Sequence, residues 1–275
     1  MNCKTRYLNL LKQVLLGLNR IDRPVYKPYN WGWENKGEAD SEVTALSNKV
    51  AQHGLLLCSK SFENPEYRYQ GGDWPIVAET MIGMKRLENI EYCFNQIIEN
   101  EIPGDLIEAG VWRGGATIFM KALLTANAIT NRKLWVADSF EGLPKPNEKY
   151  IEDKFDQHYQ YDELSVSLEE VKHNFEKYNL LDEQVIFLKG WFADTLPIAP
   201  IEKLALLRVD GDMYGSTIEV LENLYPKLSV GGFVIIDDWG AVPACKKAVM
   251  DFRSQYNITE EIQPIDWCGV YWKKQ

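Results

Sequence analysis

The sequence lacks several features that mark common classes of protein. Its five cysteines are odd in number and scattered, without Cys-x-x-Cys spacing, which argues against a disulfide framework and a zinc site and favours reduced thiols in a cytoplasmic protein. The formal net charge is −10 and no Lys/Arg cluster interrupts it, so we expect no nucleic-acid partner. Long uncharged apolar runs are also absent. The apolar stretch at 7–17 contains Asn9, Lys12 and Gln13 and lacks a small-residue cleavage site, which argues against a signal peptide or membrane span and favours an amphipathic helix.

Histidine is scarce, and internal repeats and low-complexity tracts are absent. We expect His53, His158 and His173 to be solvated or core residues, and of the three only His158, inside a long polar insertion, is worth testing for catalysis. Apolar residues make up 45% of the 275 residues, enough for one large core. One domain with an N-terminal appendage is therefore the expected organisation.

Two apolar runs end abruptly in carboxylates. Residues 204–209 lead into Asp210 and Asp212, and residues 232–236 lead into Asp237 and Asp238. Such runs are typical of buried parallel strands, whose carboxyl ends line the ligand crevice of an open α/β sheet. Four converging carboxylates repel one another, so a positive group is required among them. An all-oxygen set favours a hard divalent cation, with Mg²⁺ the usual choice.

The N-terminal third shows few periodic elements. A helix is expected over residues 1–20, with Leu8, Leu11, Leu15 and Leu18 on one side that packs on either the main domain or a second subunit. Residues 22–37 and 61–75 are predicted as irregular loops, and 40–53 as a helix capped by Ser41. We therefore expect residues 1–75 to form an extension that provides oligomer contacts and a lid, and residues 76–275 to form the main domain.

Strands and helices alternate from residue 76 onward, which predicts a mostly parallel sheet with helices on both faces. Residues 139–163 are polar and aromatic and too long for an ordinary connection, so we interpret them as a lid. The helices are predicted at 76–100, 115–127, 167–178, 216–228 and 243–256, and the strands at 104–109, 133–138, 185–189, 204–210, 233–237, 261–266 and 269–273.

The turn after the first of these strands has unusual glycine spacing. Glu108 is followed by Gly110 and then by Gly114, with Trp112 inside the turn, which differs from the Gly-x-Gly-x-x-Gly of dinucleotide folds. This form resembles the first motif of class I methyltransferases, in which the turn packs under the amino-acid end of S-adenosylmethionine and the acid interacts with its ammonium group. Asp138, at the end of the next strand, then lies where an acid receives the ribose hydroxyls. The alternative is that the glycines merely allow close helix packing.

Longer motifs resemble one family specifically. The runs 138–144 (DSFEGLP), 207–214 (LRVDGDMY), 237–245 (DDWGAVPAC) and 265–272 (IDWCGVYW) are similar to those of the macrocin O-methyltransferase family, whose better-known members methylate sugar hydroxyls of macrolide antibiotics. The resemblance covers nearly the whole chain. It implies an α/β protein with the Rossmann-like class I methyltransferase fold, a mostly parallel seven-stranded sheet, an N-terminal helical extension and a homodimer or higher homo-oligomer.

The resemblance also implies roles for individual residues. It makes Asp210, Asp237 and Asp238 ligands of Mg²⁺ and Asp212 the general base. It places Thr80 and Met81 near the methionine end of S-adenosylmethionine, and Ser139, Phe140 and Gly142 near its ribose and adenine. Trp191 is either a wall for adenine or a core aromatic. The expected cofactor-binding set is Thr80, Met81, Glu108, Gly110, Trp112, Gly114, Asp138, Ser139, Phe140, Gly142 and Trp191.

The chemistry fits these residue types. A sugar hydroxyl is hardly ionised at neutral pH, and a divalent ion together with a nearby carboxylate would promote its deprotonation. Asp210 and Asp238 could instead cap helices, and Asp212 could bind a backbone amide of its turn. Three functions therefore compete: methylation of a sugar hydroxyl on a natural product or glycan, methylation of a phenol or catechol, and a non-catalytic scaffold. The four intact acids argue against the scaffold.

Overall fold

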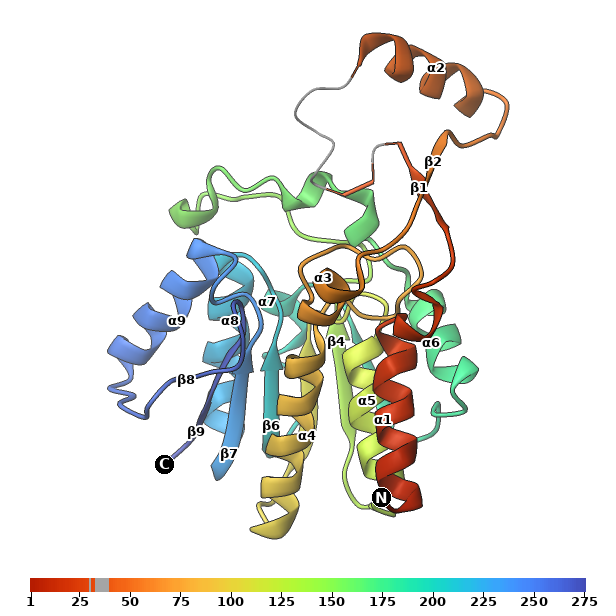
Figure 1. The fold of residues 1–275 in the computed structure, drawn as a ribbon. Coiled ribbons are helices and arrows are strands. Elements are labelled where there is room, and N and C mark those ends of the chain that lie inside the picture. Colours follow the sequence, from red (N-terminus) through yellow and green to blue (C-terminus); the bar gives the residue numbers. More distant parts are fainter. Residues whose placement is uncertain (30, 33–39) are drawn as a thin grey trace.

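The computed structural model describes residues 1–29, 31–32 and 40–275, which form one large sheet, a small two-stranded ribbon and the surrounding helices (Figure 1). The large sheet has the order β5-β4-β3-β6-β7-β9-β8, in which β3 to β7 are parallel and β9 runs antiparallel to both of its neighbours, β7 and β8. This confirms the predicted mostly parallel seven-stranded sheet. Its strands are β3 (Asp105–Ala109), β4 (Leu134–Asp138), β5 (Val185–Lys189), β6 (Leu204–Val209), β7 (Leu228–Ile236), β8 (Gln263–Pro264) and β9 (Val270–Lys273).

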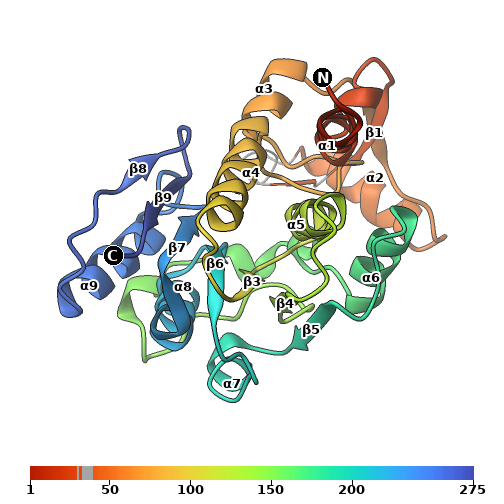
Figure 2. The same cartoon turned by 90° about the horizontal axis from the view of Figure 1, so that it is seen from below.

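Helices cover both faces of this sheet, as predicted (Figure 2). Successive residues of a strand point to opposite faces, so Leu206 packs in one core and Leu207 in the other. One core lies under α1 (Cys3–Leu15), α4 (Met84–Glu99), α5 (Gly115–Ala126) and α6 (Leu168–Lys177). The second core lies under α7 (Phe192–Thr195), α8 (Tyr214–Leu224) and α9 (Pro243–Gln255). Among the described residues, no helix has the length and apolar content needed to cross a membrane.

The N-terminal helix packs on the main domain. Leu8, Leu11 and Leu15 of α1 are buried in the same core as α5, and Lys12 pairs with Glu91 of α4 at 2.7 Å. The apolar side of this helix was expected to pack on either the main domain or a second subunit, and in the structure it packs on the main domain. α1 thus belongs to the main core, while β1 (Val25–Pro28), β2 (Cys58–Ser61) and α2 (Ser41–Ala51) form an arm that projects from it (Figure 1).

That arm corrects two loop predictions. β1 pairs antiparallel with β2, and α2 joins them at the outer end (Figure 1). The predicted loop at 22–37 thus contains a strand, while residues 30 and 33–39 lie outside the described part of the chain. The loop at 61–75 contains the short helix α3 (Pro65–Gln70). The cap of α2 is Asp40 rather than Ser41, because its side chain accepts from the backbone N of Glu42 at 2.8 Å.

Several element boundaries also differ from prediction. α4 begins at Met84, eight residues later than predicted, because arginine side chains hold the preceding backbone in an irregular path: Arg68 donates to the carbonyl of Ile82 at 2.9 Å and Arg113 to that of Ala78 at 2.9 Å. α8 begins at Tyr214 and ends at Leu224, and β7 starts at Leu228, so that Gly231 and Gly232 lie within a strand.

Candidate active site

Two cavities lie where the parallel strands end. The smaller, of about 330 Å³, is bounded by the ends of β3 and β4, the turn after β5 and part of segment 139–163. The larger, of about 890 Å³, extends toward the ends of β6 and β7 and the loop before α4. The two cavities share the wall residues Met81, Val111, Trp112, Asp153, Leu164, Asp210 and Asp212. The two spaces therefore meet beside two of the predicted acids.

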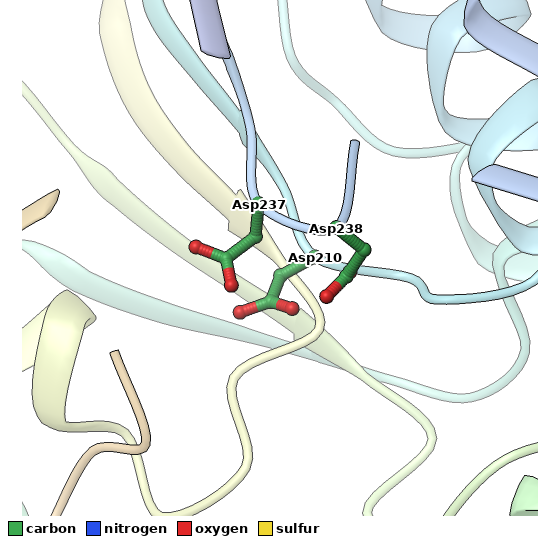
Figure 3. Close-up of side chains that lie close together, drawn as sticks. All are labelled: Asp210, Asp237 and Asp238. Carbon is green, nitrogen blue, oxygen red and sulfur yellow. The ribbon is translucent and has the colours of Figure 1, made fainter. Parts of the chain in front are cut away.

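The three predicted metal ligands come together at this edge. Asp210 follows β6, while Asp237 and Asp238 follow the neighbouring β7, and one oxygen from each lies within 4.8 Å of the others (Figure 3). The register explains the meeting, because Val209 pairs with Ile236 in parallel strands and the residues that follow emerge at the same level. Three carboxylates in one place offer the all-oxygen donor set that Mg²⁺ prefers.

Two arginines that the sequence analysis missed also reach this cluster. Arg208, fully buried on β6, pairs with Asp210 at 2.7 Å and also with Asp237 and Glu108. Arg86 of α4 pairs with Asp237 at 2.5 Å and with Asp266 at 3.1 Å. The positive group expected among these acids is therefore supplied in part by the protein itself, and the divalent cation stays a prediction. Arg208 is a charged residue inside the otherwise apolar run 204–209, and this break in the pattern could have indicated its role.

The arginines compensate the cluster only in part. Burial raises the pKa of Asp210 and of Asp238, and the neighbouring carboxylates raise both further, while Arg208 acts in the opposite direction on Asp210. Asp237 has both oxygens in ion pairs with the arginines, whereas Asp210 is paired through one oxygen. Asp238 accepts a longer hydrogen bond, at 3.3 Å, from the backbone N of Asp212. The carboxylates of Asp210 and Asp238 thus retain oxygens for a cation, and the residues fit one.

Asp212 stands at the junction of the two cavities in a strained backbone conformation. Its φ is +55°, in the left-handed region that residues with a side chain rarely adopt and that is often found at functional sites. Burial raises the pKa of its carboxyl, and His158 lowers it. The turn thus holds the side chain of Asp212 apart from the three-acid cluster while keeping it on the shared wall.

The smaller cavity depends on the glycine turn after β3. A Cβ on Gly110 would lie 1.7 Å from the carbonyl oxygen of Asp210, so only glycine allows the ends of β3 and β6 to approach this closely. Asp138 accepts from the backbone N of Val111 at 2.7 Å and from that of Phe140 at 2.8 Å, which fixes its carboxylate at the cavity wall. Trp191 is 38% exposed at the same cavity, so it is not a core aromatic.

Most of the predicted cofactor residues line one of these cavities. Gly114 and Phe140 do not: Gly114 lies against Val171 of α6, and the Phe140 ring is buried beside Phe187 at a centroid distance of 6.3 Å. Glu108 reaches only the larger cavity, and its oxygens are held by Arg208 and by Thr117. The predicted residues that line the smaller cavity are Met81, Gly110, Trp112, Asp138, Ser139, Gly142 and Trp191, and Thr80, Met81, Glu108 and Trp112 line the larger.

Segment 139–163 closes over both cavities through defined contacts. Asp153 is buried, and its two oxygens accept from the backbone N atoms of Tyr214 and Gly215, both at 2.8 Å, at the start of α8. Trp112 donates from its indole to the carbonyl of Glu163 at 2.8 Å. Short 3₁₀ helices at 151–153, 158–160 and 162–164 give the segment local order. It is a structured cover that contacts the turn carrying Asp212.

Comparisons with known proteins agree with this geometry. The sequence model of the family described as Macrocin-O-methyltransferase (TylF) matches residues 4–274. A demethyldecarbamoylnovobiocin O-methyltransferase from Streptomyces niveus is 54% identical over 211 residues, which cover 76% of this chain and 80% of the relative. An 8-demethyl-8-(2,3-dimethoxy-alpha-L-rhamnosyl)-tetracenomycin-C 4'-O-methyltransferase from Streptomyces olivaceus is 45% identical over 269 residues, which cover 97% of this chain and 92% of the relative.

A solved structure extends the likeness to three dimensions. The structure of the O-methyltransferase NovP superposes with a TM-score of 0.82 at 45% identity, and the match covers 99% of each chain. The Rossmann-like methyltransferase fold, and with it the S-adenosylmethionine cofactor that this fold implies, is thereby shown. The chain is an O-methyltransferase and belongs to the macrocin O-methyltransferase family.

Proposed function

We propose that this enzyme transfers the methyl group of S-adenosylmethionine to a sugar hydroxyl of a glycosylated natural product, with the help of a divalent cation. The observation that carries the proposal is the shared wall between the two cavities, where Asp210 and Asp212 stand between a space for the methyl donor and a space for the acceptor. Methyl transfer needs the donor and acceptor in contact, with a proton acceptor within hydrogen-bond reach.

The smaller cavity is assigned to S-adenosylmethionine. Asp138 is placed to accept hydrogen bonds from the ribose hydroxyls, since carboxylate oxygens that already accept a backbone N–H keep further lone pairs. Trp191, exposed at the cavity, is placed to stack on adenine. The backbone at Gly110 and the side chain of Met81 then lie at the methionine end. Gly114 and Phe140 support this site from behind its wall.

The larger cavity is assigned to the acceptor. Aromatic side chains that can pack against a sugar ring, among them Tyr67, Trp74 and Trp267, line it together with the acids. The names of the two relatives described above give demethyldecarbamoylnovobiocin and a rhamnosyl tetracenomycin as acceptors, and the second name includes a sugar. A neutral sugar suits a cavity lined by both polar and aromatic side chains.

The roles of the acids follow from their positions. Asp210 and Asp238, with Asp237, would hold Mg²⁺, which when bound lowers the pKa of an alcohol oxygen. Asp212 accepts the hydroxyl proton on the shared wall. The oxygen forms a bond to the methyl carbon while the sulfur–carbon bond breaks and its electron pair returns to sulfur. Arg208 and Arg86 hold the carboxylate of Asp237 in place through ion pairs, and segment 139–163 excludes water.

The test is transfer from labelled S-adenosylmethionine to a defined panel of acceptors. The panel contains demethyldecarbamoylnovobiocin, 8-demethyl-8-(2,3-dimethoxy-α-L-rhamnosyl)-tetracenomycin C, 4-nitrophenyl α-L-rhamnopyranoside and catechol, each with Mg²⁺ and with EDTA. We expect methylation of at least one glycoside, loss of turnover in EDTA, and a fall of about 100-fold or more in kcat for Asp212→Asn, since general base catalysis contributes roughly 10²–10⁴-fold. Methylation of catechol alone would show that the substrate is a phenol and not a sugar. Turnover that is unchanged by EDTA would refute the role of the cation.

A homo-oligomer is also part of the proposal. The oligomer is implied by the family resemblance. The contact was expected on α1 because of its apolar side, but the leucines of that side are buried within the same chain, so they are not available for a contact with a second subunit. Light scattering of the purified protein tests the oligomer directly, and a monomeric mass would refute it.

A further inference from the structure

A carboxylate–imidazole pair in segment 139–163 has no role in the proposed transfer. Asp156 accepts twice from His158: its Oδ1 receives the backbone N–H at 2.8 Å, and its Oδ2 lies 2.7 Å from the ring Nδ1. A carboxylate only accepts hydrogen bonds, so Nδ1 carries the hydrogen. The hydrogen bond with Asp156 raises the pKa of His158, so the neutral ring is the form present at alkaline pH, and in that form the other nitrogen, Nε2, is a hydrogen-bond acceptor. Asp156 therefore sets both the orientation and the tautomer of His158.

The pair lines the larger cavity rather than the outer surface. Asp156, His158 and Asp212 belong to the same wall, and His158 and Asp212 are close enough for each charge to perturb the pKa of the other. The Tyr161 ring packs against the imidazole at a centroid distance of 6.1 Å, and Trp74 packs edge-on against Tyr161 at 5.1 Å. Within the described ranges, the structure gives Nε2 no hydrogen-bond partner from the protein. A fixed acceptor thus faces a cavity walled by aromatic side chains.

Hydrogen bonds connect the Asp156–His158 pair to the turn that carries Asp212. The backbone N of Asp156 donates to the carbonyl of Asp153 at 2.8 Å, and the Asp153 carboxylate binds the first N–H groups of α8, directly after Asp212. The position of Nε2 is therefore fixed relative to Asp212 by backbone and carboxylate hydrogen bonds. Preorganised polar groups of this kind give a binding site its orientation and specificity.

We propose that His158 binds a second hydroxyl of the acceptor sugar, distinct from the one that is methylated, and that Asp156 is its positioning residue. This inference rests on the proposed function, because it takes the larger cavity as the acceptor site. The sugar O–H donates to Nε2. An acceptor with hydrogen or a methoxy group at that position has no donor and leaves Nε2 unpaired. His158 therefore selects acceptors that are still unmethylated there.

The experiment compares matched acceptors on the complete enzyme. kcat/KM is measured at about pH 9, where the imidazole is neutral, for 4-nitrophenyl α-L-rhamnopyranoside, its three monodeoxy forms and its three mono-O-methyl forms. The proteins compared are wild type, His158→Leu, His158→Gln and Asp156→Asn. His173→Leu is the control, since His173 is 65% exposed on its side chain and lies outside both cavities. One neutral hydrogen bond contributes about 1 kcal/mol, so we expect wild type to prefer the hydroxyl form over the deoxy form roughly fivefold at one position other than the methylated one.

The variants should divide in a defined way. His158→Leu should abolish this preference by lowering kcat/KM of the hydroxyl acceptor alone, and His158→Gln, whose amide oxygen still accepts, should restore part of it. Asp156→Asn should raise KM for the hydroxyl acceptor more than it lowers kcat. Proteins labelled at histidine should also show the His158 imidazole signal shifting when the rhamnoside is added while the His173 signal stays in place.

The possible failures are separable. If the wild type methylates glycosides and His158→Leu keeps the same roughly fivefold preference, the role of His158 is overturned and the proposed function still stands. A wild-type enzyme that methylates none of the glycosides in either panel overturns the proposed function and this inference with it. Equal losses in His158→Leu with every rhamnoside that keeps the methylated hydroxyl would show a merely structural role and would likewise refute the inference.

Discussion

Replacing Arg208 by methionine is expected to destabilise the protein by about 3–5 kcal/mol, the usual cost of removing one partner from a buried ion pair. The guanidinium is fully buried and pairs with Glu108, Asp210 and Asp237, so the change leaves three carboxylates without a shared positive partner. Methionine keeps much of the side-chain volume, so lost packing adds little. In a domain of this size 1 kcal/mol moves Tm by about 2–4 °C, which predicts a fall in Tm of roughly 6–20 °C.

Urea unfolding in EDTA, followed by tryptophan fluorescence, measures the effect. The control is Arg6→Met, at an exposed position of α1, which should change stability by no more than about 0.5 kcal/mol. The loss in Arg208→Met should be larger at pH 8 than at pH 5.5, since the carboxyl groups take up protons at the lower pH and then need less compensation. A loss below about 1 kcal/mol at pH 8 would show that the arginine does not compensate the cluster and would refute the reasoning.

Three further predictions concern the same region. Burial raises the pKa of Asp210 and Asp238 above the values of the unfolded chain, so folding takes up protons, and the metal-free protein should gain stability as pH falls from 8 to 5.5. Thermal unfolding in EDTA checks this. The gain should be smaller in an Asp210→Asn/Asp238→Asn variant, in which the raised pKa values of Glu108 and Asp212 still contribute. Gly110→Ala should abolish cofactor binding and lower the free energy of unfolding in urea by more than about 3 kcal/mol, because its Cβ would lie 1.7 Å from a carbonyl oxygen. The control is Gly54→Ala, which is also at positive φ but has no atom within 4 Å and should cost only about 1–2 kcal/mol. Trp191→Ala should weaken the binding of S-adenosylhomocysteine, measured by calorimetry, by roughly tenfold with little change in Tm. The control is Ile198→Ala, at an exposed position, and equal affinities of the two variants would contradict the assignment of Trp191 to adenine.

The sequence was sufficient where a periodic pattern and a general rule of folding act together. Apolar runs that end in Asp210 and Asp237 predict parallel strands, and parallel strands deliver their carboxyl ends to one edge of the sheet. The acid cluster could therefore be anticipated without coordinates. The glycine spacing after β3 was informative for the same reason, because a close approach of two strand ends requires Gly110.

The sequence was insufficient where long-range side-chain contacts determine the backbone. The path of residues 76–83 follows from carbonyl groups held by Arg68 and Arg113, which lie elsewhere in the chain, so helical periodicity alone placed the start of α4 too early. The β1–β2 ribbon consists of two four-residue strands paired across more than thirty residues, and neither strand shows a pattern of its own. The same limit applies to His158, whose relation to Asp156 and Asp212 depends on where segment 139–163 lies.

The arginines change how the acid cluster should be understood. The argument from sequence was that converging carboxylates require a positive partner, and this holds, but Arg86 and Arg208 supply part of the charge from within the fold. The acids at this edge are Glu108, Asp210, Asp212, Asp237, Asp238 and Asp266, so two guanidinium groups cannot neutralise them all. The remaining charge is removed either by protons, which the raised pKa of Asp210 and Asp238 reflects, or by a cation. Because a cation binds only the ionised form, its binding and the release of these protons are coupled, and the arginines keep the site folded in both states.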